Sequence, residues 1–263
     1  MASAITHAVE ATIVKVDSSF SVKSKQLEAI TNILRRHDTL AILPRSYGKS
    51  MIYQLLPAVC KLLPEQPDNA IIIVLSPLKA LIQNQIEEAN RYSSSLNLKA
   101  CNLDANYESI CAGQYNLIID TPEAWLDNIR WRDMLSSRLF RKNVKCFVVD
   151  EAHKVSWGTS TSPDGKIFRE AFSRIGSIRS ICAEGIPILA LSATVDKDYT
   201  QLVTASCSLS NSLKVIHTCS DRPNIRLSIF KIKSKCISCF SWLFDFLIKM
   251  GDNCPKILIY CYS

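Results

Sequence analysis

The sequence predicts an α/β fold in which helices cover both faces of a parallel β-sheet. Short apolar runs alternate with longer segments of helical periodicity, as in strands joined by crossover helices. The apolar runs do not alternate with polar residues, as expected for strands buried on both faces. At 263 residues and 48% hydrophobic content, the chain is long enough to bury a substantial core.

The predicted elements follow in a regular order along the chain. Strands are expected at residues 39–43, 71–75, 116–120, 145–150 and 187–193. Helices are expected at residues 50–62, 78–92, 168–183 and 197–205. From residue 220, Pro and charged residues predict an extended connector, which one helix and a final strand, KILIYCYS, follow. Because nothing follows that strand to flank it, we expect the chain to end just inside a second α/β unit.

Composition narrows the class of protein. A net charge of +7 suits a polyanionic partner, and it suits an ordinary protein surface as well. Eleven irregularly spaced cysteines favour a reducing compartment over a disulfide framework, and the CxxC pair Cys236 and Cys239 lacks a second pair at zinc-site distance. We see no signal peptide and no apolar run long enough to span a membrane, so the nucleus or the cytoplasm remains as the expected compartment.

The segment LPRSYGKSMIYQLL, residues 43–56, leads from a predicted strand into a predicted helix. A strand, a Gly-Lys-Ser turn and a helix N-terminus place backbone N–H groups and one ammonium around a phosphate. We therefore expect Gly48, Lys49 and Ser50 to bind a nucleoside triphosphate, with Lys49 on the β and γ phosphates and the Ser50 hydroxyl on Mg²⁺. Leu43 stands where the pattern has its first Gly, so the segment alone also fits a simple strand-to-helix turn.

A second motif, CFVVDEAH, places two carboxylates at the end of an apolar strand. In open parallel sheets ligands bind at this carboxyl edge. We expect Asp150 to hold the Mg²⁺ and Glu151 to orient and deprotonate the attacking water. An acidic pair about a hundred residues after a Gly-Lys-Ser turn points to a nucleotide hydrolase.

Seven short motifs in one order resemble the superfamily 2 nucleic-acid helicases, and within them the RecQ-like ATP-dependent DNA helicases. They are FSVKSKQLEAI (20–30), SPLKALIQNQ (76–85), TPEAWL (121–126), DEAH (150–153), LSAT (191–194), RPNI (222–225) and ILIYCYS (257–263). The last two resemble the family's link to its second RecA-like lobe and the first strand of that lobe. The resemblance implies a RecA-like (P-loop NTPase) fold, ATP and Mg²⁺ as cofactors, and single-stranded or partial duplex DNA as partner. It further implies 3′-5′ unwinding in DNA repair and recombination, and location in the nucleus, with the cytoplasm as the alternative.

The resemblance also implies domains and residue roles. Residues 1–19 are expected as an N-terminal helical extension, 20–219 as the ATP-binding domain, and 220–263 as the connector and start of a second RecA-like lobe. Gln26 is expected to read the adenine. The implied coupling residues are His153, Ser192 and Thr194. The implied nucleic-acid contacts are Ser76, Lys79, Thr121, Trp157, Phe168 and Arg169.

Simpler roles remain open for several of these side chains. Phe168 and Phe172 stand four residues apart and also fit the core-facing stripe of a helix. Ser76 and Thr121 also fit helix N-caps, and His153 fits a capping or core histidine.

The sequence departs from the family pattern in the phosphate loop, in a longer segment between Gly158 and Phe168, and at its end. Arg45 and Ser46 replace the usual Thr and Gly, and a Ser with positive φ costs roughly 1 kcal/mol. Arg45 either obstructs the nucleotide or adds a phosphate contact. The motifs that carry the arginine finger lie in the second lobe, most of which this chain lacks, so we expect ATP binding with little turnover and no unwinding alone. The alternatives are a non-catalytic relic that binds nucleic acid weakly and no nucleotide, and an RNA-directed DEAH-type helicase.

Overall fold

The computed structural model describes residues 2–16, 21–160, 167–194, 197–219, 225–226 and 240–259. The chain divides into two compact units, Met1–Ser220 and Asp221–Ser263. The first unit contains the sheet and is described first.

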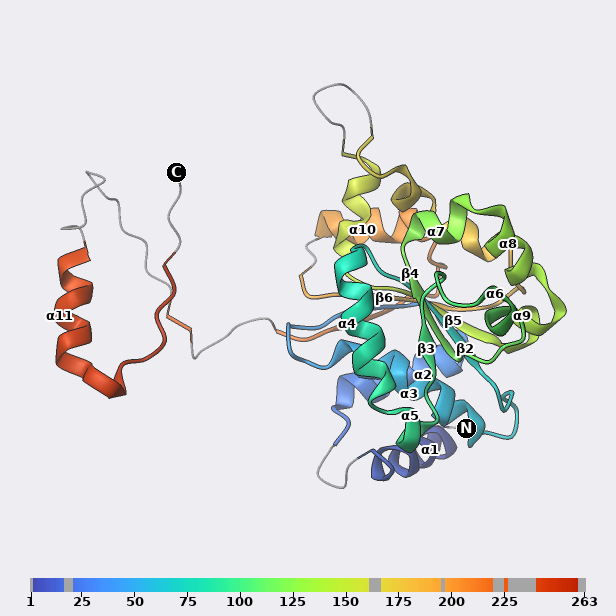
Figure 1. Ribbon diagram of the computed structural model, residues 1–263, viewed down its shortest axis with the longest axis horizontal. Helices are drawn as coiled ribbons and strands as arrows, with labels where there is room; N and C mark the ends of the chain where they lie inside the picture. The colour runs from blue at the N-terminus through green and yellow to red at the C-terminus, as the bar shows by residue number, and fades with distance from the viewer. Residues whose placement is uncertain are drawn as a thin grey trace. The chain divides into compact units, whose positions relative to one another are not determined.

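A parallel sheet of seven strands forms the centre of the first unit, with strand order β3-β4-β2-β5-β6-β1-β7 (Figure 1). The α/β prediction is therefore confirmed. The strands are β1 (Thr39–Ile42), β2 (Ile71–Leu75), β3 (Ala100–Cys101), β4 (Leu117–Asp120), β5 (Val144–Val149), β6 (Ile188–Ser192) and β7 (Lys214–His217). The prediction missed β3, which has two residues, and β7, an edge strand in which only Ile216 is buried. Neither presents the continuous apolar run that marks a central strand.

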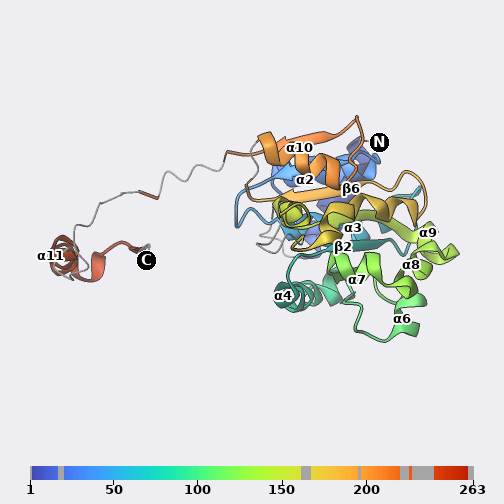
Figure 2. The same ribbon diagram turned by 90° about the horizontal axis from the view of Figure 1, so that it is seen from above.

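Two layers of helices cover the sheet, because alternate strand residues face opposite cores. Leu40 and Ile42 belong to one core, whereas Ala41 and Leu43 belong to the other. The Ala41 side is covered by α1 (Ala2–Val14), α2 (Ser24–Leu34), α3 (Lys49–Lys61), α4 (Lys79–Asn90) and α5 (Ser93–Leu96). The Leu40 side is covered by α6 (Tyr107–Cys111), α7 (Pro122–Asp127), α8 (Ile129–Ser136), α9 (Arg138–Asn143), η1 (Ala152–Gly158), η2 (Glu170–Ser180) and α10 (Lys197–Ser206). Helices α6 to α9 lie together in both views (Figures 1 and 2).

The helix predicted at residues 168–183 is instead the 3₁₀ segment η2. Ser173, Ser177 and Ser180 each donate a side-chain hydrogen bond to the carbonyl three residues earlier. Such local bonds compete with α-helical pairing, and Gly176 weakens it further. The apolar spacing was correct, but these residues favour the tighter turn.

The second unit contains α11 (Ser241–Met250), which confirms the helix predicted after the connector, and the 3₁₀ turn η4 (Gly251–Asn253). Residues 256–259 of the predicted final strand have no regular secondary structure. The rest of that strand, most of RPNI, and Cys236 and Cys239 lie outside the described residues. Within the described parts of the chain, all cysteines are free and no helix is both long and apolar enough to cross a bilayer.

Candidate nucleotide and nucleic-acid site

The strand register brings the predicted motifs to one edge of the sheet. Leu75 at the end of β2 pairs with Asp120 of β4 and Val149 of β5, and Ile42 of β1 pairs with Ser192 of β6. The segments that follow these strands therefore start side by side at the carboxyl edge, where parallel sheets bind ligands. Every predicted catalytic and metal-binding residue lies in or next to these segments.

The phosphate loop runs from Leu43 to Gly48 and opens directly into α3. Gly48 caps the helix with φ +86°, and Ser46 has φ +63°, so both positions use the left-handed region. Because the first N–H groups of a helix lack intrahelical acceptors, the start of α3 can donate to an anion. The loop therefore has the backbone form of a phosphate site despite its missing glycines.

The side chain of Lys49 extends back from the start of α3 into the phosphate loop. Its Nζ atom donates to the carbonyls of Leu43 and Pro44, at 3.2 and 3.4 Å. This arrangement holds one positive charge inside the turn, beside the helix N-terminus, where a phosphate would add two favourable interactions.

Gln26 of α2 is buried behind the same loop. Its Nε2 donates to the carbonyls of Tyr47 and Gly48, at 3.2 and 2.8 Å, and its Oε1 accepts from the backbone N–H of Lys23 at 2.8 Å. A Cβ atom on Gly48 would lie 2.7 Å from Gln26 Nε2, and the position has φ +86°, so the backbone conformation and the contact both favour glycine. Gln26 thus supports the loop, and its reading of adenine stays a prediction.

The positive φ of Ser46 gives a direct stability prediction. A Cβ in this region costs roughly 1 kcal/mol, so Ser46→Gly is expected to raise the free energy of unfolding by about that amount. Urea unfolding followed by circular dichroism measures the change. Ser46→Ala is the matched control, because it removes the hydroxyl but keeps the Cβ. An equal gain in both variants would show that the hydroxyl, and not the backbone, carries the effect.

Asp150 and Glu151 lie just past β5. Asp150 Oδ1 accepts from the backbone N–H of Glu151 at 2.9 Å, and Oδ2 accepts from Gln85 Nε2 at 2.7 Å. Burial raises the pKa of Asp150 from its ordinary value of 3.8 to about 6, and the neighbouring Glu151 carboxylate adds to the increase. Glu151 has φ +46°, a strained conformation for a residue with a side chain, and such strain is concentrated at functional sites.

The three predicted coupling residues do come together. His153 Nδ1 lies 3.1 Å from Ser192 Oγ and 3.4 Å from Glu151 Oε2, and Ser192 Oγ donates to the Thr194 carbonyl at 2.9 Å. Burial lowers the pKa of His153, so the neutral form is favoured at pH 7. A continuous path of contacts therefore joins Glu151 to the segment after β6.

The donor set fits Mg²⁺, although no group of three or more His, Cys, Asp or Glu residues able to hold a metal occurs in the described part of the chain. Mg²⁺ is usually bound through one or two carboxylates and substrate phosphates, with several waters, so a full protein cage is not required. Two buried oxygens at this edge, Glu151 Oε2 and Gln85 Oε1, have no hydrogen-bond partner among the described residues. Ser50 and Asp150 would hold the ion, and these orphan acceptors suit its hydration shell.

The aromatic residues after DEAH form a second group. Trp157 makes edge contacts with Phe168 and Phe172, with ring centroids 5.6 and 5.7 Å apart. Phe172 is buried in the core, whereas Phe168 precedes η2 and is 62% exposed. The core-stripe alternative therefore holds for Phe172 and is wrong for Phe168.

Arg169 is committed to protein partners. Its guanidinium forms a bidentate ion pair with Glu123, with N–O distances of 2.6 and 2.7 Å, and donates to the carbonyl of Pro77. It also lies over the Phe172 ring, 4.6 Å from the centroid. Arg169 thus ties the aromatic segment to the segments after β2 and β4, and a phosphate would compete with Glu123 for it.

The remaining predicted nucleic-acid contacts differ in exposure. Lys79, the first residue of α4, is exposed. Thr121 is buried and caps α7 by accepting from the Ala124 N–H at 3.4 Å, which confirms its predicted capping. Ser76 is buried and does not cap α4, because Leu78 occupies the N-cap position. Lys79 alone among the three offers a charge to a polyanion.

Two further residues make contacts at this edge that the sequence does not indicate. Glu123 lies within the TPE motif, and Gln85 ends the SPLKALIQNQ motif. A Glu two residues after a capping Thr is typical of the acidic residues that stabilise the start of a helix. A Gln on an amphipathic helix is typical of the solvent-exposed face. Only the tertiary contacts with Arg169 and Asp150 reveal their positions.

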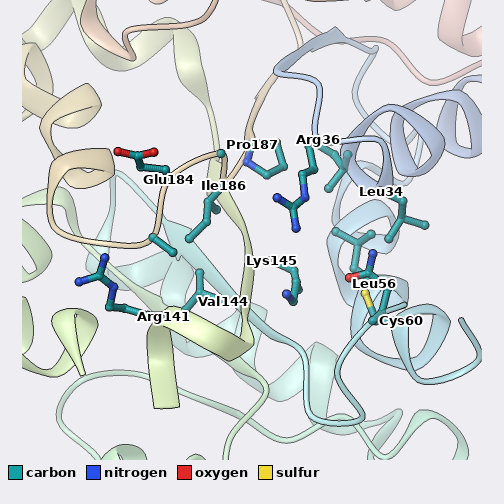
Figure 3. Close-up of a pocket in the computed structure, with 14 residues that line it drawn as sticks. Leu34, Arg36, Leu56, Cys60, Arg141, Val144, Lys145, Glu184, Ile186 and Pro187 are labelled. Atoms are coloured by element: carbon teal, nitrogen blue, oxygen red, sulfur yellow. The ribbon is translucent and has the colours of Figure 1, made fainter. Parts of the chain in front are cut away.

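A pocket lies at the amino edge of the sheet, opposite the candidate site (Figure 3). Its volume is ≈ 500 Å³, including the part that is open to solvent. Arg36, Lys145 and Glu184 are among its lining residues, and it contains none of the predicted site residues. Val144 begins β5 and Pro187 precedes β6, so this pocket opens at the amino ends of the strands. The predicted catalytic and metal-binding residues lie instead at the carboxyl edge.

Comparison with known proteins agrees with this geometry. The family profile described as DEAD/DEAH box helicase matches residues 23–202. The probable ATP-dependent DNA helicase RecS of Bacillus subtilis is 28% identical over 80% of this chain and 39% of its own length. ATP-dependent DNA helicase RecQ of Synechocystis is 29% identical over 80% of this chain and 42% of its own. ATP-dependent DNA helicase hus2/rqh1 of Schizosaccharomyces pombe is 29% identical over 92% of this chain and 17% of its own length. The chain thus spans well under half the length of these relatives.

Solved structures agree on the fold. The DUF1998 helicase MrfA matches 93% of this chain and 37% of its own, with a TM-score of 0.60 and 16% identity. A hypothetical ATP-dependent RNA helicase from Sulfolobus tokodaii matches 81% of this chain and 57% of its own, with a TM-score of 0.55 and 14% identity. At these identities the likeness concerns architecture, and it supports a RecA-like sheet.

Proposed function

The chain belongs to the DEAD/DEAH box helicase family, and we propose that it is the ATP-binding lobe of a RecQ-like 3′-5′ DNA helicase. One observation carries the proposal: Lys49, Asp150 and Glu151 all lie at the carboxyl edge of the sheet, and so does the start of the aromatic segment whose Phe168 is exposed. A phosphate site and a base-stacking site on neighbouring segments are what a nucleic-acid-stimulated ATPase requires.

In this proposal each residue at the edge has one task. Lys49 and the N–H groups at the start of α3 would bind the phosphates, and Asp150 and Ser50 would hold Mg²⁺, which when bound would supply positive charge to neutralise the phosphoryl oxygens. Glu151, whose buried Oε2 lies near His153 but has no hydrogen-bond partner among the described residues, would accept the proton of the attacking water. Hydrolysis also needs an arginine from a second RecA-like lobe, as in related NTPases.

DNA would enter at the aromatic segment. Arg169 links this segment to Glu123 after β4 and to Pro77 after β2, so a DNA strand that displaces this ion pair would release the aromatic segment from the segments after β2 and β4. His153 then connects the DEAH segment with Ser192. This path supports a coupling role for His153, Ser192 and Thr194.

The test of the DNA contact is a substitution of Phe168. Because stacking of one base on an aromatic ring contributes ~1–3 kcal/mol, Phe168→Ala is expected to weaken binding of a fluorescent single-stranded DNA by about tenfold in an anisotropy titration. The melting temperature should fall only slightly, since Phe168 is 62% exposed and loses one edge contact with Trp157.

Ile129→Ala is the matched control, because Ile129 is an apolar residue of α8 that is 72% exposed. Equal DNA affinity of wild type and Phe168→Ala would remove the aromatic segment from the proposed DNA path. A loss for both variants would indicate a nonspecific apolar contribution.

A further inference from the structure

Gln85 is a residue of α4 that contacts the predicted metal ligand directly. Its Nε2 atom donates to Asp150 Oδ2 at 2.7 Å, across 65 positions of sequence. The contact joins α4, the helix that follows β2, to the end of β5. Strands β2 and β5 are neighbours in the sheet.

The chemistry of the pair fixes which way the amide faces. An ionised carboxylate only accepts hydrogen bonds, so the Gln85 nitrogen must be the atom that faces Asp150. Gln85 Oε1 therefore lies on the other side of the amide, where it is buried and has no partner among the described residues. A buried acceptor left unpaired costs roughly 1–3 kcal/mol, so this oxygen is placed to receive a donor.

The Asp150 carboxylate is held at both oxygens. The backbone N–H of Glu151 binds Oδ1 at 2.9 Å, while Gln85 binds Oδ2. Two bonds to two oxygens fix the rotation of the carboxylate and leave each oxygen a further lone pair. Of the two donors, only Gln85 is a side chain that evolution or mutagenesis can remove.

We propose that Gln85 is a positioning residue for the Mg²⁺ site: it orients Asp150 through Nε2 and accepts a hydrogen bond from the hydration shell of the ion through Oε1. This inference rests on the proposed function, since it concerns the same nucleotide site. Outer partners of this kind tune metal affinity by roughly 10- to 100-fold. Mg²⁺ keeps several of its waters in proteins, so an acceptor for those waters contributes to binding.

The position of Gln85 also links the two halves of the site. Helix α4 begins at Lys79, the exposed cation predicted to contact nucleic acid, and Gln85 lies less than two turns further along. A shift of α4 would therefore be transmitted to Asp150 through one hydrogen bond.

The experiment uses Gln85→Met, which keeps the length of the side chain but removes both hydrogen-bonding atoms. Mn²⁺ serves as a spectroscopic probe for the ion, and its binding to the chain in the presence of ADP is followed by electron paramagnetic resonance. We expect Mn²⁺ affinity to fall about tenfold. Binding of a fluorescent ADP analogue in EDTA should not change, because that measurement involves no ion.

Gln83→Met is the matched control, because Gln83 is an exposed residue of the same helix that bonds only Glu87 in the described chain. Wild-type Mn²⁺ affinity in Gln85→Met would overturn the inference while leaving the proposed function intact. Equal loss of ADP binding with and without metal would show that Gln85 has a structural role, which also contradicts it. If wild type binds no nucleotide under any condition, the proposed function fails and the inference falls with it.

Discussion

Replacement of Lys49 by alanine is expected to weaken Mg-ATP binding by about 100-fold. The ammonium would exchange its bonds to the Leu43 and Pro44 carbonyls for bonds to two phosphates. A net gain of about 1.5 kcal/mol for each of the two exchanged hydrogen bonds corresponds to a factor of about 100 in affinity. The rest of the loop, with Gly48 and the start of α3, would be unchanged.

Isothermal titration calorimetry of Mg-ATP measures this loss. Lys61→Ala provides the control, since Lys61 is the exposed last residue of the same helix and its removal changes the net charge equally. A similar affinity for wild type and Lys49→Ala would mean that the nucleotide, if bound, lies elsewhere. Melting curves of each variant establish that the fold is retained.

The substitution Asp150→Asn is expected to change metal binding and stability in opposite directions. Removing the carboxylate should abolish the Mg²⁺ dependence of ATP binding. The same change should raise the melting temperature at pH 7 by about 5–10 °C, because burial raises the pKa of Asp150 from 3.8 to about 6 and ionised Asp150 is therefore unfavourable by about 3 kcal/mol.

The direction with pH follows from the raised pKa. Asp150 has a pKa of about 6 in the fold against an ordinary value of 3.8, so the folded state gains stability as Asp150 becomes protonated. The advantage of Asp150→Asn should therefore be complete above pH 6 and disappear as the pH falls toward 4. Mg²⁺ binding by wild type should weaken over the same interval, since the ion needs the carboxylate.

Differential scanning fluorimetry from pH 4 to 8 measures this stability difference. Asp133→Asn, at an exposed position of α8, should show no such dependence. An Asp150→Asn variant less stable than wild type at pH 7 would show that the carboxylate is stabilised by its hydrogen bonds more than it is destabilised by burial.

The central strands were predictable because burial on both faces leaves a continuous apolar run in the sequence. Ile71–Leu75 was predicted with its exact bounds, and the other four strands to within about a residue or two. The short helices between residues 107 and 143 were not, since each has eight residues or fewer and too little periodicity to be recognised. The 3₁₀ form of η2 depends on local serine hydrogen bonds that hydrophobic spacing does not report.

The candidate site was predictable where a residue with a suitable side chain directly follows a predicted strand. Gly48, Lys49 and Asp150 could be placed because a parallel sheet brings the ends of its strands to one edge. Partners from distant segments could not: Gln85 reaches Asp150 across 65 residues, and Arg169 reaches Glu123 across 46. Such contacts depend on how α4 and the aromatic segment pack, which no local pattern encodes.

The measurement that tests the account most directly is the calorimetric titration of Mg-ATP into the wild-type chain. We predict one binding site with a dissociation constant in the micromolar range, about −8 kcal/mol at 1 μM, despite Arg45 and the strained Ser46. Absence of binding by a chain with a cooperative melting transition would contradict the account. It would support instead a helicase-derived relic whose phosphate loop no longer admits nucleotide.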